Sequence, residues 1–211
     1  MRLWDPYEIE KRSFEIIEKE TIEKRGSIPF PYEEWNIVRR LIHTTADFEI
    51  IDKIYFSDNA IESGIHAIKE GCVIVTDTNM AKAGISKAKL KNFDVSVSCF
   101  VSDQDVAMYA KEKGVTRSIA AIEKAKKINK KTIFALGNAP TALFYLIDLM
   151  DRGEIKPALI IGMVVGFVCA EESKEELILR SKVPFITLRG RKGGSSLVAA
   201  IINALAELAS R

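Results

Sequence analysis

The sequence has few cysteines and few histidines, and this limits the metal and redox chemistry that it can support. The 211 residues include three cysteines, Cys72, Cys99 and Cys169, and two histidines, His43 and His66. The cysteines are odd in number, far apart and set in apolar segments, so we expect buried free thiols in a reducing compartment. No CxxC or HxxxH spacing supplies zinc ligands, and no GxSxG motif supplies a serine nucleophile. The sequence therefore gives no support for a metal site.

The sequence also lacks a charge excess and a long hydrophobic run. Its 31 Lys and Arg and 29 Asp and Glu leave a net charge of +2, which gives no electrostatic case for nucleic acid or a membrane surface. The longest apolar run, residues 157–170, is too short for a helical span and contains Gly162 and Gly166. The first 20 residues carry charges throughout, unlike a signal peptide. We expect a cytoplasmic protein with a single domain over residues 1–211.

The order of apolar runs predicts the fold class. Residues 1–50 predict N-terminal helices, at 5–24 and at about 32–44, that pack on an α/β core. From residue 53, helix-length segments alternate with six short β-branched runs, at 53–57, 72–76, 94–98, 131–136, 158–163 and 184–188. These runs are continuously apolar, which favours strands that are buried on both faces of a mainly parallel sheet. The sequence thus predicts a three-layer α/β/α sandwich with its ligand site beyond the carboxyl ends of the strands.

One predicted helix carries an unusual polar face. At about 100° per residue, Asn36, Arg40 and His43 share the face opposite the apolar stripe of the helix at 32–44. In an arbitrary protein this pattern favours a solvated helix face, and the alternative is a general acid or base beside an anion-binding arginine. His66 follows Ile65 in a short amphipathic segment, and we interpret it as structural or merely exposed.

Two predicted strand-to-helix turns are candidate anion sites. RGRKGGSS (189–196) precedes the last helix, which Ser195 or Ser196 is expected to cap, but it matches neither nucleotide-binding glycine pattern. GNAPT (137–141) places Pro140 at the start of a helix. Arg117 adds a further guanidinium for a carboxylate. Together these features predict a polyanionic small-molecule ligand, with tight turns and helix caps as the alternative interpretation, and they identify no reaction.

Seven segments in order carry a resemblance to a known family. They are KRSF (11–14), VRRLIHTTAD (38–47), IVTDTNMAKAGI (74–85), VTRSIAAIEKA (115–125), GNAPTALF (137–144), IIGMVVGFVCAEESKEEL (160–177) and RGRKGGSSLVAAIINAL (189–205). Over nearly its whole length the chain resembles the precorrin-8X methylmutases, including the cobalt-precorrin-8 form, which are isomerases of cobalamin (vitamin B12) biosynthesis.

The resemblance implies a reaction and assigns residues to it. A ring methyl group migrates from C-11 to C-12 of the macrocycle, which gives hydrogenobyrinic acid or its cobalt analogue. The matching histidine, His43, is implied to donate a proton to the ring system and to take it back. Ser13 and Arg40 match substrate-binding positions, and Arg117 matches a further one. The family also implies a flavodoxin-like sheet, a homodimer with active sites near the subunit interface, and no cofactor.

Such a substrate fits the features found in the sequence. A corrinoid is a planar, largely apolar tetrapyrrole with acetate and propionate groups around its edge, so it needs a broad cleft, arginine side chains and free backbone N–H groups. The chain departs from the family at Val164, where a proline is expected, and at Cys169, where a glycine is usual. We expect altered packing of that loop with His43 unaffected.

Two other functions stay open at this point. A tetrapyrrole carrier would bind the corrinoid without catalysis, and replacement of His43 would leave its binding unchanged. A flavin- or nucleotide-dependent enzyme on the same fold is disfavoured because the sequence has no glycine fingerprint.

Overall fold

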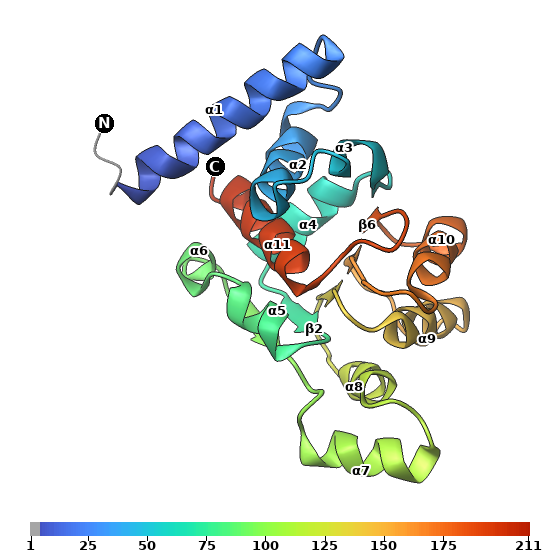
Figure 1. Cartoon of the computed structure of the whole chain (residues 1–211). Coiled ribbons are helices and arrows are strands. Elements are labelled where there is room, and N and C mark those ends of the chain that lie inside the picture. The colour runs from blue at the N-terminus through green and yellow to red at the C-terminus, as the bar shows by residue number, and fades with distance from the viewer. Residues whose placement is uncertain (1–4) are drawn as a thin grey trace.

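A computed structural model describes residues 5–211, and a six-stranded sheet forms the centre of this part of the chain (Figure 1). The strands are β1 (Ile54–Phe56), β2 (Val73–Thr76), β3 (Ser96–Ser98), β4 (Thr132–Leu136), β5 (Leu159–Gly162) and β6 (Phe185–Leu188). Their order in the sheet is β1-β6-β5-β4-β2-β3, with β1 antiparallel to β6 and all other pairs parallel. All six predicted strands are present. The five parallel strands follow the flavodoxin order, which confirms the predicted fold class.

Helices cover both faces of the sheet. They are α1 (Pro6–Arg25), α2 (Tyr32–Thr45), α3 (Ile50–Lys53), α4 (Ala60–Lys69), α5 (Asn79–Gly84), α6 (Lys87–Leu90), α7 (Gln104–Lys113), α8 (Arg117–Ala125), α9 (Pro140–Asp151), α10 (Ala170–Arg180) and α11 (Ser195–Ala209). The sequence-based prediction omitted α3, α5, α6 and α8. None of the helices within residues 5–211 is long and apolar enough to cross a membrane.

Alternating side chains of the inner strands divide the core between the two faces. On β4, Ile133 and Ala135 join a cluster with α2, α4 and α11, whereas Phe134 and Leu136 join a second cluster with α8, α9 and α10. β2, β4, β5 and β6 are therefore buried on both sides, as the continuous apolar runs predicted, whereas β1 and β3 are partly exposed, and the prediction is wrong for them. The last helix, α11, is the most buried, and it contacts α2, α4 and α5.

Helix α1 projects from this body and lies mainly against α2 (Figure 1). Asp5 caps its first turn by accepting a hydrogen bond from the Tyr7 N–H at 3.0 Å. Ile17 is buried, but Ile16 and Ile22 are 48% and 44% exposed. The helix thus leaves a large part of its apolar surface uncovered. The assignment of residues 1–211 to one domain stays a prediction.

The loop that follows β5 contains both departures from the family pattern. Val164 is fully buried in the second core cluster. Cys169 directly precedes α10 in the left-handed conformation, with φ 61°, and its side chain is exposed. L-amino acids pay for this conformation and glycine does not, so Cys169 is a strained position.

Candidate active site

The site residues of α2 lie at the carboxyl edge of the parallel sheet. Helix α2 runs antiparallel to α11: Arg211 bonds the hydroxyl of Tyr32 at one end, and Lys192 bonds Asp47 at the other. Lys192 Nζ lies 2.5 Å from Asp47 Oδ2 and 3.0 Å from Glu49 Oε2. Since Lys192 precedes α11 and Asp47 follows α2, these bonds place the last turn of α2 beside the loop between β6 and α11.

The carboxylates of this contact carry charge at neutral pH. Hydrogen bonds from Lys53 and Lys192 lower the pKa of Glu49 to about 2. A hydrogen bond from Lys192 likewise lowers the pKa of Asp47. The link between α2 and the loop is therefore an ion-pair network and persists over the physiological pH range.

His43 occupies the last turn of α2 with its ring exposed. Its imidazole meets the ring of Phe14 edge to face, with 5.5 Å between centroids and 72° between planes. Phe14 follows Ser13 on α1, so the contact brings Ser13, Arg40 and His43 into one neighbourhood. One side of the imidazole is thus fixed by an apolar ring while the other is open to a ligand.

The polar face of α2 is less solvated than its sequence predicted. Arg40 retains 13% side-chain exposure, and Asn36 is buried, because α1 and α11 cover this face. Arg40 bonds Glu10 of α1 at 2.8 Å and Glu207 of α11 at 2.9 Å, and its guanidinium lies 5.2 Å from the Phe14 ring centroid. The interpretation as a plain solvated face is wrong for these two residues. Arg40 already binds two carboxylates, and it holds α1 against α2.

Ser13 and Arg117 lie in different surroundings. The Ser13 hydroxyl donates to the carbonyl of Ile9 at 2.9 Å, one turn back on α1. Arg117 is the first residue of α8 and is exposed. The preceding Thr116 meets Thr141 of α9, 3.3 Å between hydroxyls, so Arg117 also lies at the carboxyl edge. Helix α8 covers the opposite face from α2, however, and no contact joins Arg117 to His43 within residues 5–211 (Figure 1).

The predicted anion site at GNAPT is filled from inside the protein. Asp77, at the end of β2, accepts hydrogen bonds from the N–H groups of Gly137, Asn138 and Ala139 at 3.0, 2.7 and 2.8 Å. These donors lie at the start of α9, where Pro140 is the first helical residue as predicted. The expectation of free N–H groups at this turn is wrong, because a buried carboxylate saturates them. The sequence signal for Asp77 was an acidic residue directly after an apolar strand.

The loop between β6 and α11 differs from its prediction in one respect. Gly194 is the N-cap of α11, and no side chain caps the helix, so the assignment of the cap to Ser195 or Ser196 is wrong. The Ser195 hydroxyl instead pairs with Thr78 at 2.7 Å. Gly193 is required here, since a Cβ would overlap the carbonyl oxygen of Met163.

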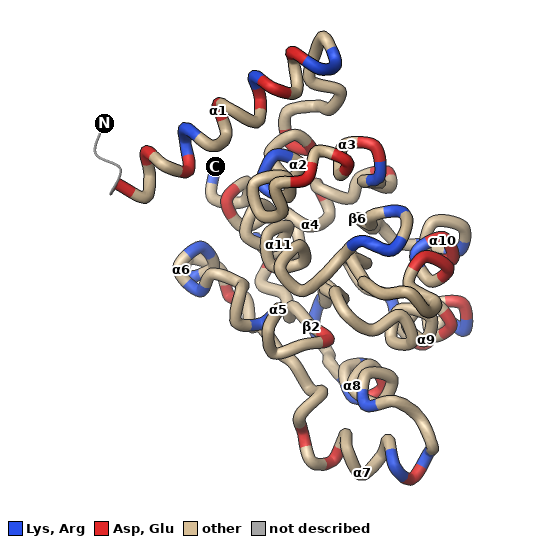
Figure 2. Tube along the Cα trace, in the orientation of Figure 1, with Lys and Arg blue, Asp and Glu red and all other residues tan. Residues whose placement is uncertain are grey.

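An exposed aromatic ring and an arginine meet where this loop touches the loop after β5. Phe167 is 85% exposed, and the Arg191 guanidinium lies 5.6 Å from its ring centroid. Neither Arg191 nor Arg117 forms an ion pair with a carboxylate within residues 5–211. Figure 2 shows basic residues along this segment between β6 and α11. The sequence-based reasoning did not single out Phe167.

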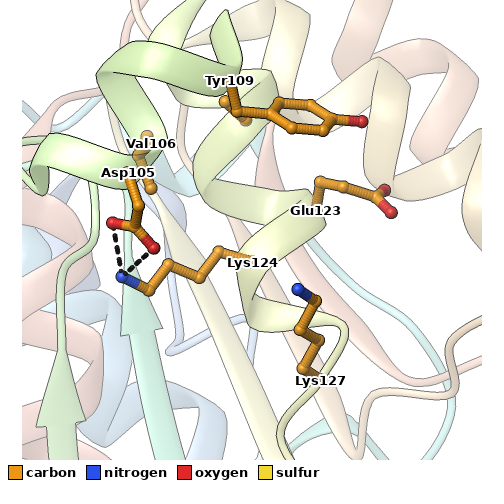
Figure 3. A pocket seen from close by; sticks show the side chains of 7 residues that line it. Asp105, Val106, Tyr109, Glu123, Lys124 and Lys127 are labelled. Atoms are coloured by element: carbon orange, nitrogen blue, oxygen red, sulfur yellow. Dashed lines mark hydrogen bonds and ion pairs between the residues drawn. The ribbon is translucent and has the colours of Figure 1, made fainter.

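Two grooves elsewhere are unsuited to a polycarboxylate. A groove of about 250 Å³ between α1 and α2 is lined by Tyr7, Phe14, the cations Lys11 and Arg39, and the acidic residues Glu10, Glu15, Glu18 and Glu207. A second cavity, of about 240 Å³ between α7 and α8, contains Lys124 bound to Asp105 (Figure 3). Lys124 also pairs with Asp103, outside the lining of this cavity. The four carboxylates of the first outnumber its two cations, which disfavours a polycarboxylate, and the second lies between two helices that hold none of the α2 residues.

The other histidine and the thiols lie apart from these residues. His66 is exposed on α4, 3.2 Å from Glu70. Cys72 is buried, and burial raises the pKa of its thiol to about 11. Cys99 is partly buried and Cys169 is exposed, so the expectation of three buried thiols is wrong for both. Within residues 5–211 no three His, Cys, Asp or Glu side chains are grouped as metal ligands.

Comparison with known proteins adds a consistent set of similarities. Residues 8–208 match the family model of precorrin-8X methylmutase. The chain is 44% identical to the cobalt-precorrin-8 methylmutase of Leptospira interrogans, over 96% of this chain and 94% of the relative. It is 46% identical to the cobalt-precorrin-8 methylmutase of Priestia megaterium, over 97% of this chain and 88% of the relative. The solved precorrin-8x methyl mutase of Thermus thermophilus superposes with a TM-score of 0.87 at 39% identity, over 97% and 96% of the two chains.

Proposed function

The chain belongs to the precorrin-8X methylmutase family, whose members are isomerases of cobalamin biosynthesis, and on this premise we propose that His43 moves the proton in the reaction. The enzyme shifts a methyl group within a corrinoid precursor. The proposed shift runs from C-11 to C-12 and needs a proton delivered to the ring system and withdrawn afterwards. A positioned general acid contributes about 10²–10⁴-fold to the rate of such a step.

The observation that carries the proposal is the exposed imidazole of His43, held edge-on by Phe14 at the carboxyl edge of the sheet. The contact with Phe14 restricts the ring without consuming either nitrogen. A histidine kept in one orientation beside an open surface can meet the edge of a planar macrocycle. Among the described residues no aromatic ring contacts His66, and His66 lies near the end of α4 that leads into the start of β2, which favours His43.

The substrate carboxylates need cationic partners that are not already paired. Arg117 and Arg191 are the candidates, since neither binds a carboxylate within the described part of the chain. Arg40 contributes by fixing α1 to α2, and it can bind a substrate carboxylate only by sharing its guanidinium with Glu10 and Glu207. Ser13 contributes through its oxygen, which remains able to accept a hydrogen bond.

We further propose that the enzyme is a homodimer joined through α1. This projecting helix exposes Tyr7, Ile9, Ile16 and Ile22, and exposed apolar patches of this kind mark association surfaces. A dimer would cover these side chains next to Phe14 and bring residues of the second copy to the open side of His43. Sedimentation of Ile16→Glu against the wild type tests this: the wild type is expected to be a dimer and the variant a monomer. A monomeric wild type at micromolar concentration contradicts it.

An absorbance titration with hydrogenobyrinic acid tests the assignment of the site. Saturable binding with a spectral shift is expected for the wild type, an altered shift for His43→Ala, and weaker binding for Arg117→Ala. Lys111→Ala is a control for loss of an exposed positive charge, and it is expected to bind as the wild type does. The same affinity and spectral shift in His43→Ala as in the wild type would contradict the assignment of the proton transfer to His43. Absence of binding by the folded wild type would overturn the proposed site.

A carrier without catalysis is not favoured. The relatives named above are methylmutases, and this chain matches them over 94% and 88% of their length and carries a histidine at the exposed end of α2.

A further inference from the structure

Lys174 of α10 is a fully buried ammonium that the proposed reaction does not use. Its side chain has 0% exposure, and its Nζ donates a 2.8 Å hydrogen bond to the main-chain carbonyl of Lys192. No carboxylate lies within ion-pair distance of it among residues 5–211. Glu171 and Glu175 of the same helix act on this charge only from beyond ion-pair distance. Burying such a charge is costly, so a lysine that donates to a loop carbonyl calls for a physical reason.

The carbonyl that Lys174 holds belongs to a junction of two loops. The Gly194 N–H donates to Met163 O at 2.8 Å, and the Gly166 N–H donates to Arg191 O at 3.2 Å. These bonds join the loop after β5 to the loop after β6 on both sides of Lys192. Lys174 reaches the same segment from α10, so three donors fix the backbone that carries Arg191.

The side chain of Lys192 points from this junction toward α2. It bonds Asp47 and Glu49, and Asp47 lies four residues after His43. The Asp47 carboxylate in turn accepts the N–H of Glu49 at 2.9 Å, which fixes the turn at the end of α2. Lys192 is thus held through its carbonyl by α10, and through its ammonium by the segment that follows His43.

From this arrangement we infer that Lys174 and Lys192 are positioning residues, which keep the loop of Arg191 and the His43 end of α2 in fixed relation around the corrinoid. The inference rests on the proposed function of His43. Neither lysine touches the substrate in this scheme. Small displacements of a positioned group lower the rate of a reaction strongly, by up to about 10²-fold for a shift of 1 Å.

Kinetics of the full chain with precorrin-8X test the inference. Lys174→Met and Lys192→Met are expected to lower kcat/KM by about tenfold or more, with a fall in kcat as well as a rise in KM. Lys192→Arg, which keeps both ion pairs, is expected to restore activity to within about threefold. Lys130→Met is the matched control: Lys130 is 52% exposed against 49% for Lys192, bonds Asp94 at 2.9 Å, and lies at the opposite edge of the sheet. It should retain wild-type kinetics.

A merely structural role would lower the melting temperature and leave kcat/KM unchanged well below it. A folded Lys192→Met protein with the kcat/KM of the wild type would therefore overturn the inference. This test holds even where Lys174→Met fails to fold. Hydrogen exchange separates this failure from a failure of the proposed function. Even if the wild type converts no precorrin-8X, amides of residues 43–49 and 189–194 should exchange faster in Lys192→Met than in Lys130→Met. Unchanged exchange in these segments would contradict the inference independently of turnover.

Discussion

Asp77 is expected to be one of the most sensitive polar positions of the fold. In the wild type, three N–H donors share the two carboxylate oxygens of Asp77 at 2.7–3.0 Å. Asp77→Asn replaces one of these oxygens by an NH2 group and leaves a single carbonyl oxygen as acceptor. At least one buried N–H then faces an amide NH2, and each buried donor without a partner costs about 1–3 kcal/mol. Loss of the charge-assisted bonds adds to this. We expect the free energy of unfolding to fall by about 3 kcal/mol.

Calorimetry and urea unfolding measure this loss directly. For a chain of this size, 1 kcal/mol corresponds to about 2–4 °C, so the melting temperature should fall by about 6–12 °C. Asp94→Asn is the control, because the Asp94 side chain is 88% exposed and, among residues 5–211, its ion pair is with the exposed Lys130. Its effect should stay within about 0.5 kcal/mol. A loss below about 1 kcal/mol in Asp77→Asn would refute the reasoning that the three N–H groups depend on this carboxylate.

Three further predictions concern single side chains. Cys169 holds a left-handed backbone at φ 61°, which costs an L-residue about 1–2 kcal/mol, and Cys169→Gly removes this cost. Because glycine adds chain entropy to the unfolded state, the net gain in stability measured by thermal unfolding should be about 0.5–1 kcal/mol. Ellman's reagent should modify the exposed Cys169 in the native protein and reach Cys72 only after unfolding, because Cys72 is buried and its pKa is raised to about 11; rapid native modification of Cys72 would contradict its burial. Burial lowers the pKa of Lys174 from 10.5 to about 8. Between these pH values the unfolded chain binds more protons than the folded one, so stability should rise with pH in the wild type relative to Lys174→Met, and equal pH slopes would contradict the burial of this charge.

The sheet was predictable from the sequence because its signal is local. β2, β4, β5 and β6 are short apolar runs, and burial on both faces makes each run continuous, as Ile133 to Leu136 show. The glycines at the ends of α4, α7 and α9 were likewise local signals, and Gly71, Gly114 and Gly153 all have positive φ.

The site was only partly predictable because its contacts join distant parts of the chain. Helical periodicity placed Arg40 beside His43, but Glu207, which pairs with Arg40, is 167 residues away. Asp77 and the N–H groups that it binds are 60–62 residues apart. The pattern on α2 fixes which way a side chain points from its own helix, and only tertiary packing decides what covers it.

Turnover of precorrin-8X by His43→Ala, compared with His66→Ala, tests the central claim most directly. Both substitutions remove an exposed imidazole, but His66 pairs with Glu70 away from the carboxyl-edge loops. We expect His43→Ala to lose about 10²–10⁴-fold in kcat while it still binds hydrogenobyrinic acid, and His66→Ala to turn over as the wild type does. Equal turnover by His43→Ala and His66→Ala would contradict the role of His43 as the proton donor.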